Sequence, residues 1–461
     1  MSHIERVIES HRRRHRRELA RAVLAATSVL CGLSTSAAIV TAGAQDRAVS
    51  AQALRLGELY DEAQRASPRV AAAQALVRAS EARVSSAKLP PDPQLQLGFM
   101  NYTLPGLRPM DVLGMTQLQL MQMVPVAGKL GLSGRVASSQ AFAQSERARD
   151  VKWTLRSDVA MAFYDLYQTD QRLAVSRETL RLLQNIGRTA ESMYRVGEGR
   201  QADVLRAQVE IARMVEDTVR MTTMRAGMAA RLDALLNRSS HELLPPPALP
   251  AFPDSVPSMD SLVALAETGR PMLRAGKRDL QAADAQAKLA RREIWPDLTV
   301  GLQYGTQSGE MGTERMGSLM LGASVPVFAG RRQLRMRDET VAMRQMAAAD
   351  LTAMRADTRA RVAEAYANLT RARNLAVLYR TTVIPQAEAT VASSLAAYRV
   401  GSVDFMTLLD NRMTVNGYRQ ELFALDAEQG KAWADLEMLV GRELFDANNV
   451  ATDTATAREK R

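Results

Sequence analysis

The sequence predicts a mainly α-helical protein with a membrane β portion, in which a strand pair followed by a long helical hairpin occurs twice. The first observation is a repeated tetrapeptide: Tyr194-Arg195-Val196-Gly197 recurs as Tyr398-Arg399-Val400-Gly401. The second is the alternation of apolar and polar residues in four short segments, which is the period of a β-strand. The third is a proline-free stretch with helical periodicity between Pro125 and Pro245.

The repeat extends along most of the chain. Four further landmarks recur in the same order: Leu59–Pro68 with Leu262–Pro271, Pro91-Asp92 with Pro296-Asp297, Val124-Pro125-Val126 with Val325-Pro326-Val327, and Val159–Phe163 with Val362–Tyr366. A period of about 200 residues is too long for a solenoid and indicates duplication of a whole unit. We therefore expect a first repeat over 45–242, a Pro-rich linker over 243–258, a second repeat over 259–445 and a disordered tail over 446–461.

Residues 1–44 are predicted to be a signal peptide. A basic run, Arg12–Arg17, precedes the uncharged segment Ala22–Ala44, and Ala42-Gly43-Ala44 fits a cleavage site. This leader implies export. Two alternatives stay open, because the uncharged run is long enough for an uncleaved anchor and Cys31 offers a site for acylation.

Residue usage excludes several classes of protein. Beyond the leader the chain has no cysteine and one histidine, His241, so zinc, haem and iron–sulfur sites lack their usual ligands and no cofactor is expected. No nucleophile–base set or phosphate loop is present, so we expect a non-enzyme. Beyond the leader, the charged residues are spread along helical faces rather than gathered in a basic patch, so nucleic acid is not an expected partner.

The first predicted elements of each repeat are a helix and two strands. In the first repeat these are an amphipathic helix over 54–89 and strands over 93–104 and 115–125; in the second the strands cover 297–306 and 317–327. Strands of about ten residues with one apolar and one polar face suit a transmembrane β-barrel in outer-membrane lipid. A half-buried soluble sheet shows the same alternation. Export favours the membrane.

Four strands are too few for a closed barrel. The smallest membrane barrels have about eight strands, and an open sheet edge is not viable in lipid. Chains must therefore pool their strands, so that two chains give eight and three give twelve. The pattern requires an oligomer without choosing its size.

Long helices follow each strand pair. Leu166, Leu173 and Leu180 recur every seven residues, which is typical of coiled-coil packing. Continuous helices over 129–194 and 331–398 span roughly 100 Å each, and Pro385 is expected to kink the second. At the repeated tetrapeptides, glycine allows the chain to stop a helix and reverse, so each tetrapeptide marks the tip of a hairpin.

Together the duplication, the strand pairs followed by long helices, and the tip motif resemble the TolC family of outer-membrane efflux proteins. The run Pro91-Asp92-Pro93 and the segment Met115–Lys129 are most similar to its heavy-metal (CzcC/CusC-like) branch. The resemblance implies a homotrimer with a twelve-stranded β-barrel and a twelve-helix periplasmic tunnel. It also implies a periplasmic adaptor (membrane fusion) protein and an inner-membrane RND-type pump as partners.

The same resemblance implies roles for residues at the tips. The gate or constriction residues are Asp410, Asp203, Tyr398 and Tyr194, and the tip-turn and adaptor-contact residues are Gly197, Gly401, Val196, Val400, Leu205 and Leu409. Thr407 and Val403 depart from the family pattern of acidic and basic residues, which leaves fewer charges to close the gate. An ordinary surface carboxylate is the alternative interpretation of Asp410.

The expected function is an outer-membrane exit duct for metal ions or small toxic compounds. The methionine-rich stretch Met110, Met115, Met121 and Met123 suits soft metals, although methionine also serves as packing filler. Two alternatives remain: the duct of a type I protein-secretion system, and a coiled-coil scaffold of the envelope.

Overall fold

The structure, a computed structural model, describes residues 53–103, 105–106, 108–109, 115–239, 244–309 and 312–449, which belong to one compact unit. The predicted signal peptide, Cys31, His241 and residues 450–461 of the predicted tail lie outside the described residues. Residues 446–449, where that tail was expected to begin, contact the linker: Ala251 donates its backbone N–H to the carbonyl of Asn449 at 2.7 Å.

Helices dominate the described chain, which confirms the mainly helical prediction. They are α2 Leu56–Ala66, α3 Pro68–Ser86, α4 Lys129–Arg195, α5 Gln201–Leu236, α6 Met259–Gly269, α7 Pro271–Arg292, α8 Gln333–Leu378, the π-helical segment η2 Tyr379–Val383, α9 Ile384–Arg399 and α10 Phe405–Val440. The strands are β1 Gln94–Met100, β2 Tyr102–Thr103, β3 Arg108–Pro109, β4 Met115–Val124, β5 Asp297–Gly309 and β6 Gly312–Ser324.

The prediction of a single helix over 54–89 is wrong, because the helix is interrupted at Ser67, between α2 and α3. Ser67 is extended, with φ −70° and ψ 122°. The ring of Pro68 disfavours a helical conformation in the residue before it. Arg270 before Pro271 does the same between α6 and α7, so both repeats open with a short helix and a longer one.

The four main strands form one antiparallel sheet in the order β1-β4-β5-β6. The β4–β5 pairing joins the two repeats, and β1 and β6 lie at the edges of the described sheet. Leu97 lies opposite Leu118, and Leu120 opposite Leu302, which lies opposite Leu319. Because directly opposed residues share a face, all the leucines of the sheet lie on one face.

The other face of the sheet carries glutamine, glycine and methionine. Its larger side chains are Gln94, Gln96, Met100, Met115, Gln117, Gln119, Met121, Met123, Gln303, Gln307, Glu314, Met316 and Met320. Gln303 donates a hydrogen bond to Gln117 across the strands. The predicted apolar and polar faces are therefore both present.

The strand ends differ from the predictions. β1 stops at Met100 because Asn101 takes a left-handed conformation (φ 58°), which asparagine tolerates better than most residues. The hairpin of β5 and β6 continues to the pair Gly309 and Gly312, through residues expected to form a loop. β6 ends at Ser324, short of the predicted 327, where Pro326 removes a backbone donor.

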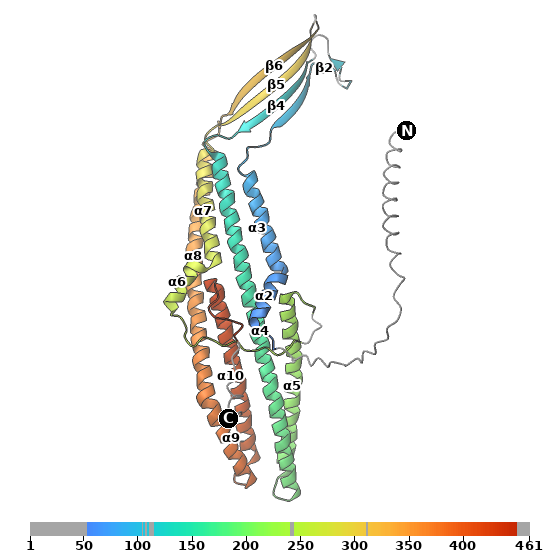
Figure 1. Ribbon diagram of the computed structural model, residues 1–461, viewed down its shortest axis with the longest axis vertical. Helices are drawn as coiled ribbons and strands as arrows, with labels where there is room; N and C mark the ends of the chain where they lie inside the picture. The colour runs from blue at the N-terminus through green and yellow to red at the C-terminus, as the bar shows by residue number, and fades with distance from the viewer. Residues whose placement is uncertain are drawn as a thin grey trace, which may run out of the picture. The chain divides into compact units, whose positions relative to one another are not determined.

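The helices form two long hairpins (Figure 1). In the first, α4 runs for 67 residues and returns as α5. In the second, α8, η2 and α9 run to the tip and α10 returns. The π-helical segment lies just before Pro385, which cannot donate a hydrogen bond to the carbonyl of Thr381, so the irregularity falls at the predicted kink. Figure 1 shows the strands at one end of these helices and both hairpin turns at the other.

Each repeat has an apolar cluster near the middle of its hairpin. The first surrounds Phe163, Tyr164 and Leu166 of α4, and the second surrounds Leu369 of α8 and Trp433 of α10. Small residues permit close packing: a Cβ added to Gly430 of α10 would lie 2.2 Å from the Tyr164 ring. The repeats therefore share one continuous helical layer.

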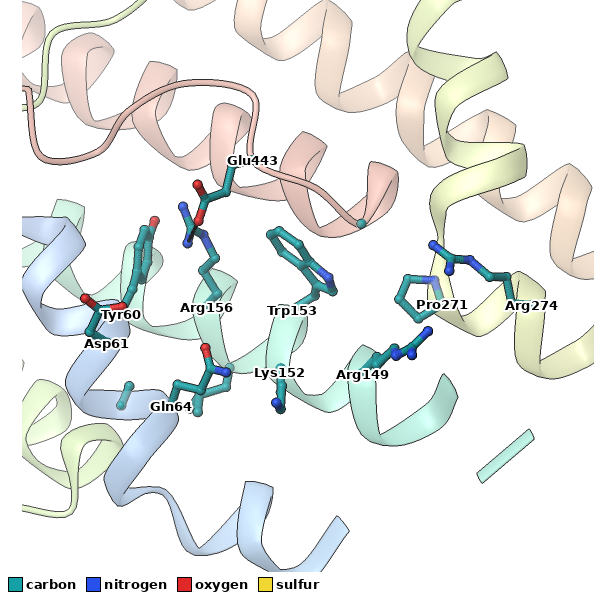
Figure 2. Close-up of a pocket in the computed structure, with 13 residues that line it drawn as sticks. Tyr60, Asp61, Gln64, Arg149, Lys152, Trp153, Arg156, Pro271, Arg274 and Glu443 are labelled. Carbon is teal, nitrogen blue, oxygen red and sulfur yellow. Dashed lines mark hydrogen bonds and ion pairs between the residues drawn. The ribbon is translucent and has the colours of Figure 1, made fainter. Parts of the chain in front are cut away.

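A polar cluster beside a pocket ties the repeats together near these cores, and Figure 2 shows its members Tyr60, Arg156 and Glu443. The Arg156 guanidinium lies 3.9 Å from the centroid of the Tyr60 ring and donates to Glu437 (3.2 Å) and Glu443 (2.7 Å). Glu437 is 1% exposed and accepts the backbone N–H of Leu444 at 2.8 Å. Burial raises the pKa of Glu437, and the charge of Arg156 opposes that rise.

Among the described residues, no helix combines the length and the hydropathy that crossing a membrane would need.

Candidate functional site

The two hairpin turns end their first helices with the same backbone motif. In the first turn Gly197 (φ 81°) donates its N–H to the carbonyl of Tyr194 at 3.1 Å, and Glu198 donates to Met193 at 3.0 Å. This pair of bonds is a Schellman motif, which satisfies carbonyls left free at a helix C-terminus. Its left-handed residue is almost always glycine because a Cβ is strained there.

The second turn repeats the motif. Gly401 (φ 73°) donates to the carbonyl of Tyr398 at 3.1 Å, and Ser402 donates to Ala397 at 3.0 Å. The next helix is capped by Asp404, whose carboxylate accepts the backbone N–H of Thr407 at 3.3 Å. The side-chain hydrogen bond from Thr407 holds the pKa of Asp404 below its usual value.

Side chains of four helices meet beside the turns in one apolar group, which we call the tip cluster. Its buried members are Leu183, Ala190, Ala207, Met214, Tyr398, Phe405, Leu408 and Leu409. They come from α4, α5, α9 and α10, so both hairpins contribute. The tips are therefore packed together rather than separate.

The two predicted gate tyrosines have different surroundings. Tyr398 is 5% exposed and its ring packs edge-on against Phe405 with centroids 5.9 Å apart, whereas Tyr194 is 46% exposed. Burial raises the pKa of the Tyr398 hydroxyl, and the nearby negative charge of Asp203 raises it further. The charge of Asp203 therefore acts on Tyr398, whereas Tyr194 lies at the surface.

The two predicted gate aspartates lie on different helices. Asp203 is in the first turn of α5 and is half-buried, where the helix dipole favours a negative charge. Asp410 is exposed on α10 and lines a groove between α10 and α5. Arg206 and Arg213 line the same groove from α5.

Three of the six predicted tip-turn and adaptor-contact residues are exposed apolar side chains. Val400 is 78%, Val196 is 69% and Leu205 is 53% exposed. Leu409 differs, because it is 3% exposed and packs inside the tip cluster. It supports the tip from within and leaves little surface for a partner.

The structure also shows charged residues that the sequence reasoning missed. Arg419 of α10 donates to Glu388 of α9 at 2.5 Å and to Glu178 of α4 at 3.0 Å, which links the two hairpins above the tip cluster. Burial lowers the pKa of Arg412, which lies two helical turns before Arg419 on α10, and the like charge of Arg419 lowers it further. Nothing in the sequence spacing indicated this network, because its members lie far apart along the chain.

In the part of the chain that the structure describes, no group of three or more His, Cys, Asp or Glu side chains is arranged to hold a metal ion.

The fold is that of known outer-membrane channels. A structure of CusC aligns with a TM-score of 0.72 and 18% identity, over 84% of this chain and 92% of that one. The outer membrane protein VceC of Vibrio cholerae aligns with a TM-score of 0.72 and 17% identity, over 85% and 97%. At these identities the likeness concerns the fold alone.

Curated relatives match part of the chain. Outer membrane efflux protein BepC of Brucella suis is 28% identical over 234 residues, 48% of each chain. Toluene efflux pump outer membrane protein TtgF of Pseudomonas putida is 28% identical over 232 residues, 47% of this chain and 46% of that one. The match spans about half the length of each relative.

The pattern of one protein family covers both repeats. It matches residues 59–238 and 262–442, which contain the strands, both hairpins and both tips. The chain therefore belongs to the outer membrane efflux protein family.

Proposed function

We propose that the protein is the outer-membrane channel of a tripartite efflux system, a passive exit duct for metal ions or small toxic compounds. As a member of this family it is an outer-membrane protein that extends into the periplasm. The working form is a homotrimer with a twelve-stranded barrel and a twelve-helix tunnel. Its tips bind a periplasmic adaptor protein that connects them to an inner-membrane RND-type pump, and the duct itself performs no catalytic step.

The apolar face of the sheet carries this proposal. Leu321 is 77%, Leu95 66%, Leu319 64% and Leu97 61% exposed. Contiguous apolar surface of this kind is rare on a protein surrounded by water and is the expected outer surface of a barrel in lipid. The glutamine-bearing face then lines a polar interior.

The free edges support association of several chains. In the described sheet β1 and β6 each have a single partner, so each presents unpaired backbone groups. Such groups cost several kcal/mol each in lipid (about 2–7 kcal/mol) and must be paired. Three copies of four strands supply twelve, which matches the architecture that the family resemblance implies.

The tips are the proposed gate and docking surface. Tyr398 lies in the tip cluster, where the charge of Asp203 acts on it, and Asp410 lines a groove to which Leu409 of that cluster also contributes. Around a threefold axis, three Asp410 carboxylates attract cations and narrow the exit. The exposed valines of both turns, Val196 and Val400, give the adaptor an apolar contact.

The cargo has two candidate classes. The name of one relative refers to toluene, which supports small apolar compounds. The polar face of the sheet carries all six methionines of the main strands (Met100, Met115, Met121, Met123, Met316 and Met320), and their thioethers support soft ions such as copper(I). The efflux relatives also favour an efflux duct over a type I secretion duct or a scaffold.

Two measurements test the proposal. Protein purified in mild detergent should have the mass of three chains, and planar bilayers that receive it should show discrete ion conductance. Deletion of the gene should sensitise cells to toluene or to copper, and the chemical that does so identifies the cargo class. A stable monomer without conductance would contradict the channel, whereas loss of secretion of a protein with normal resistance would favour the secretion duct.

A further inference from the structure

The contact between the two repeats inside one chain combines a strand pairing with a buried ion pair. At the N-terminus of α4, the Lys129 side chain is 7% exposed. Its Nζ donates to the Asp297 carboxylate at 2.8 Å and to the carbonyl of Trp295 at 2.9 Å. Asp297 begins β5, and β5 pairs with β4, so this ion pair closes the end of the β4–β5 contact.

The residues equivalent to Lys129 and Asp297 in the opposite repeats form no ion pair within the described chain. Gly128-Lys129 corresponds to Gly330-Arg331, and Pro296-Asp297 corresponds to Pro91-Asp92. Arg331 and Asp92 are both exposed, and within the described chain neither forms an ion pair. They belong to opposite edges of the sheet: Arg331 follows β6, and Asp92 precedes β1.

The strand register between the two repeats of one chain predicts the register between β6 of one chain and β1 of another. Leu120 of β4 pairs with Leu302 of β5. The repeats align Val124-Pro125 with Val325-Pro326 and Pro91-Asp92 with Pro296-Asp297. In this alignment Leu120 corresponds to Leu321 and Leu302 corresponds to Leu97. The equivalent pair between two chains is therefore Leu321 with the partner subunit's Leu97. Both leucines lie on the apolar face, as the pleat requires.

We propose that a second copy of this chain binds at the β6 edge in this register: Leu321 lies opposite the partner subunit's Leu97, and Arg331 forms an ion pair with the partner subunit's Asp92. This inference rests on the proposed oligomeric channel and specifies its subunit contact. Each contact pairs the backbone groups of two exposed edges and neutralises two exposed charges of opposite sign. One difference from the internal contact is that Glu293, 3.7 Å from Lys129, corresponds to Lys88, so Arg331 faces one carboxylate instead of two.

Cysteine pairs test the register. In a Cys31→Ala background, Leu97→Cys with Leu321→Cys should yield covalent trimers on denaturing gels after mild oxidation. Within one chain these positions lie on strands separated by β4 and β5, about 14 Å apart, so an internal disulfide cannot form. The matched control is Leu97→Cys with Ala323→Cys, shifted by two residues on the same face to about 7–8 Å, which should remain uncrosslinked.

The outcomes separate this register from the channel itself. A native trimer that crosslinks through the shifted pair, or through neither pair, would overturn the register and leave the channel in place. A protein that is monomeric before oxidation would overturn both. Covalent trimers from the first pair alone would establish the contact.

Charge reversal tests the ion pair independently. Arg331→Glu should speed subunit dissociation about tenfold, because two carboxylates then face each other. Combining Arg331→Glu with Asp92→Arg should restore the original rate. Arg332→Glu, an equal change at the neighbouring exposed arginine, is the control and should have little effect. The ion pair would be contradicted if Arg331→Glu and Arg332→Glu sped dissociation equally. It would also be contradicted if the double variant did not regain the original dissociation rate.

Discussion

Gly430 shows how a single residue fixes the distance between two helices. Tyr164 of α4 is fully buried, and its ring occupies the space that a Cβ at position 430 of α10 would need. Glycine is a poor helix former, so its presence inside a 36-residue helix is explained by this contact. The aromatic ring and the missing side chain together set how closely the repeats approach.

We expect Gly430→Ala to lower the free energy of unfolding by about 1–3 kcal/mol, because the ring has no space to move. Gly417→Ala, in the same helix with nothing within 4 Å of the added Cβ, is the control and should raise it by about 0.5–1 kcal/mol through better helix propensity. Thermal or urea unfolding of detergent-solubilised protein measures both. Equal effects would show that the contact with Tyr164 does not limit packing.

At the scale of the element, the cluster around Arg156 couples α4 to the end of α10. Glu437 is buried with a single cationic partner at hydrogen-bond distance, Arg156, and two backbone donors. Removing one partner of such a pair leaves an uncompensated buried charge. We therefore expect Arg156→Ala to lower the unfolding free energy by about 3 kcal/mol near neutral pH.

The pH dependence of stability gives a second readout of the same elements. Because the pKa of Glu437 is raised in the fold, the folded state holds more protons than the unfolded state just above the ordinary value of 4.5. This contribution to stability is present below that value and is lost as pH rises through the folded pKa. Glu437→Gln should therefore flatten the fall in unfolding free energy with rising pH, and Arg156→Ala should steepen it. Parallel profiles in urea titrations would exclude Glu437 as the titrating group.

Helices and strands were predictable from the sequence where the local spacing of apolar residues determines them. The heptad spacing and the absence of proline predicted α4 almost to the residue, and alternation predicted the faces of β4 and β5. The errors lie where one residue overrides a pattern: Pro68 breaks a helix, and Asn101 ends a strand. The ion pairs of Arg156 and Arg419 join distant segments, so only the folded chain reveals them. The roles of the gate residues stay predictions.

At the scale of the whole molecule, one duplicated chain forms only part of the proposed channel. Its sheet has two open edges and an exposed apolar face, and its tip cluster joins both hairpins at the far end of the helices. In the proposed channel, copies that complete the sheet also bring their tips together, because α4 runs unbroken from Lys129, just after β4, to the first turn. Barrel closure and tip geometry would therefore be coupled through this continuous helix.

This coupling makes Asp410 a test of the assembled gate. Its carboxylate is exposed beside the α5–α10 groove and forms no ion pair within the described chain. If three copies face one axis, Asp410→Asn should raise the single-channel conductance by about twofold and reduce cation preference, because a ring of charge and its bound cations are lost. The control is Glu428→Gln, on the same helix about five turns from Asp410, where Arg371 already neutralises the carboxylate at 2.7 Å. Unchanged conductance and selectivity in Asp410→Asn would remove this residue from the gate, and equal changes in both variants would assign the effect to the overall charge of α10.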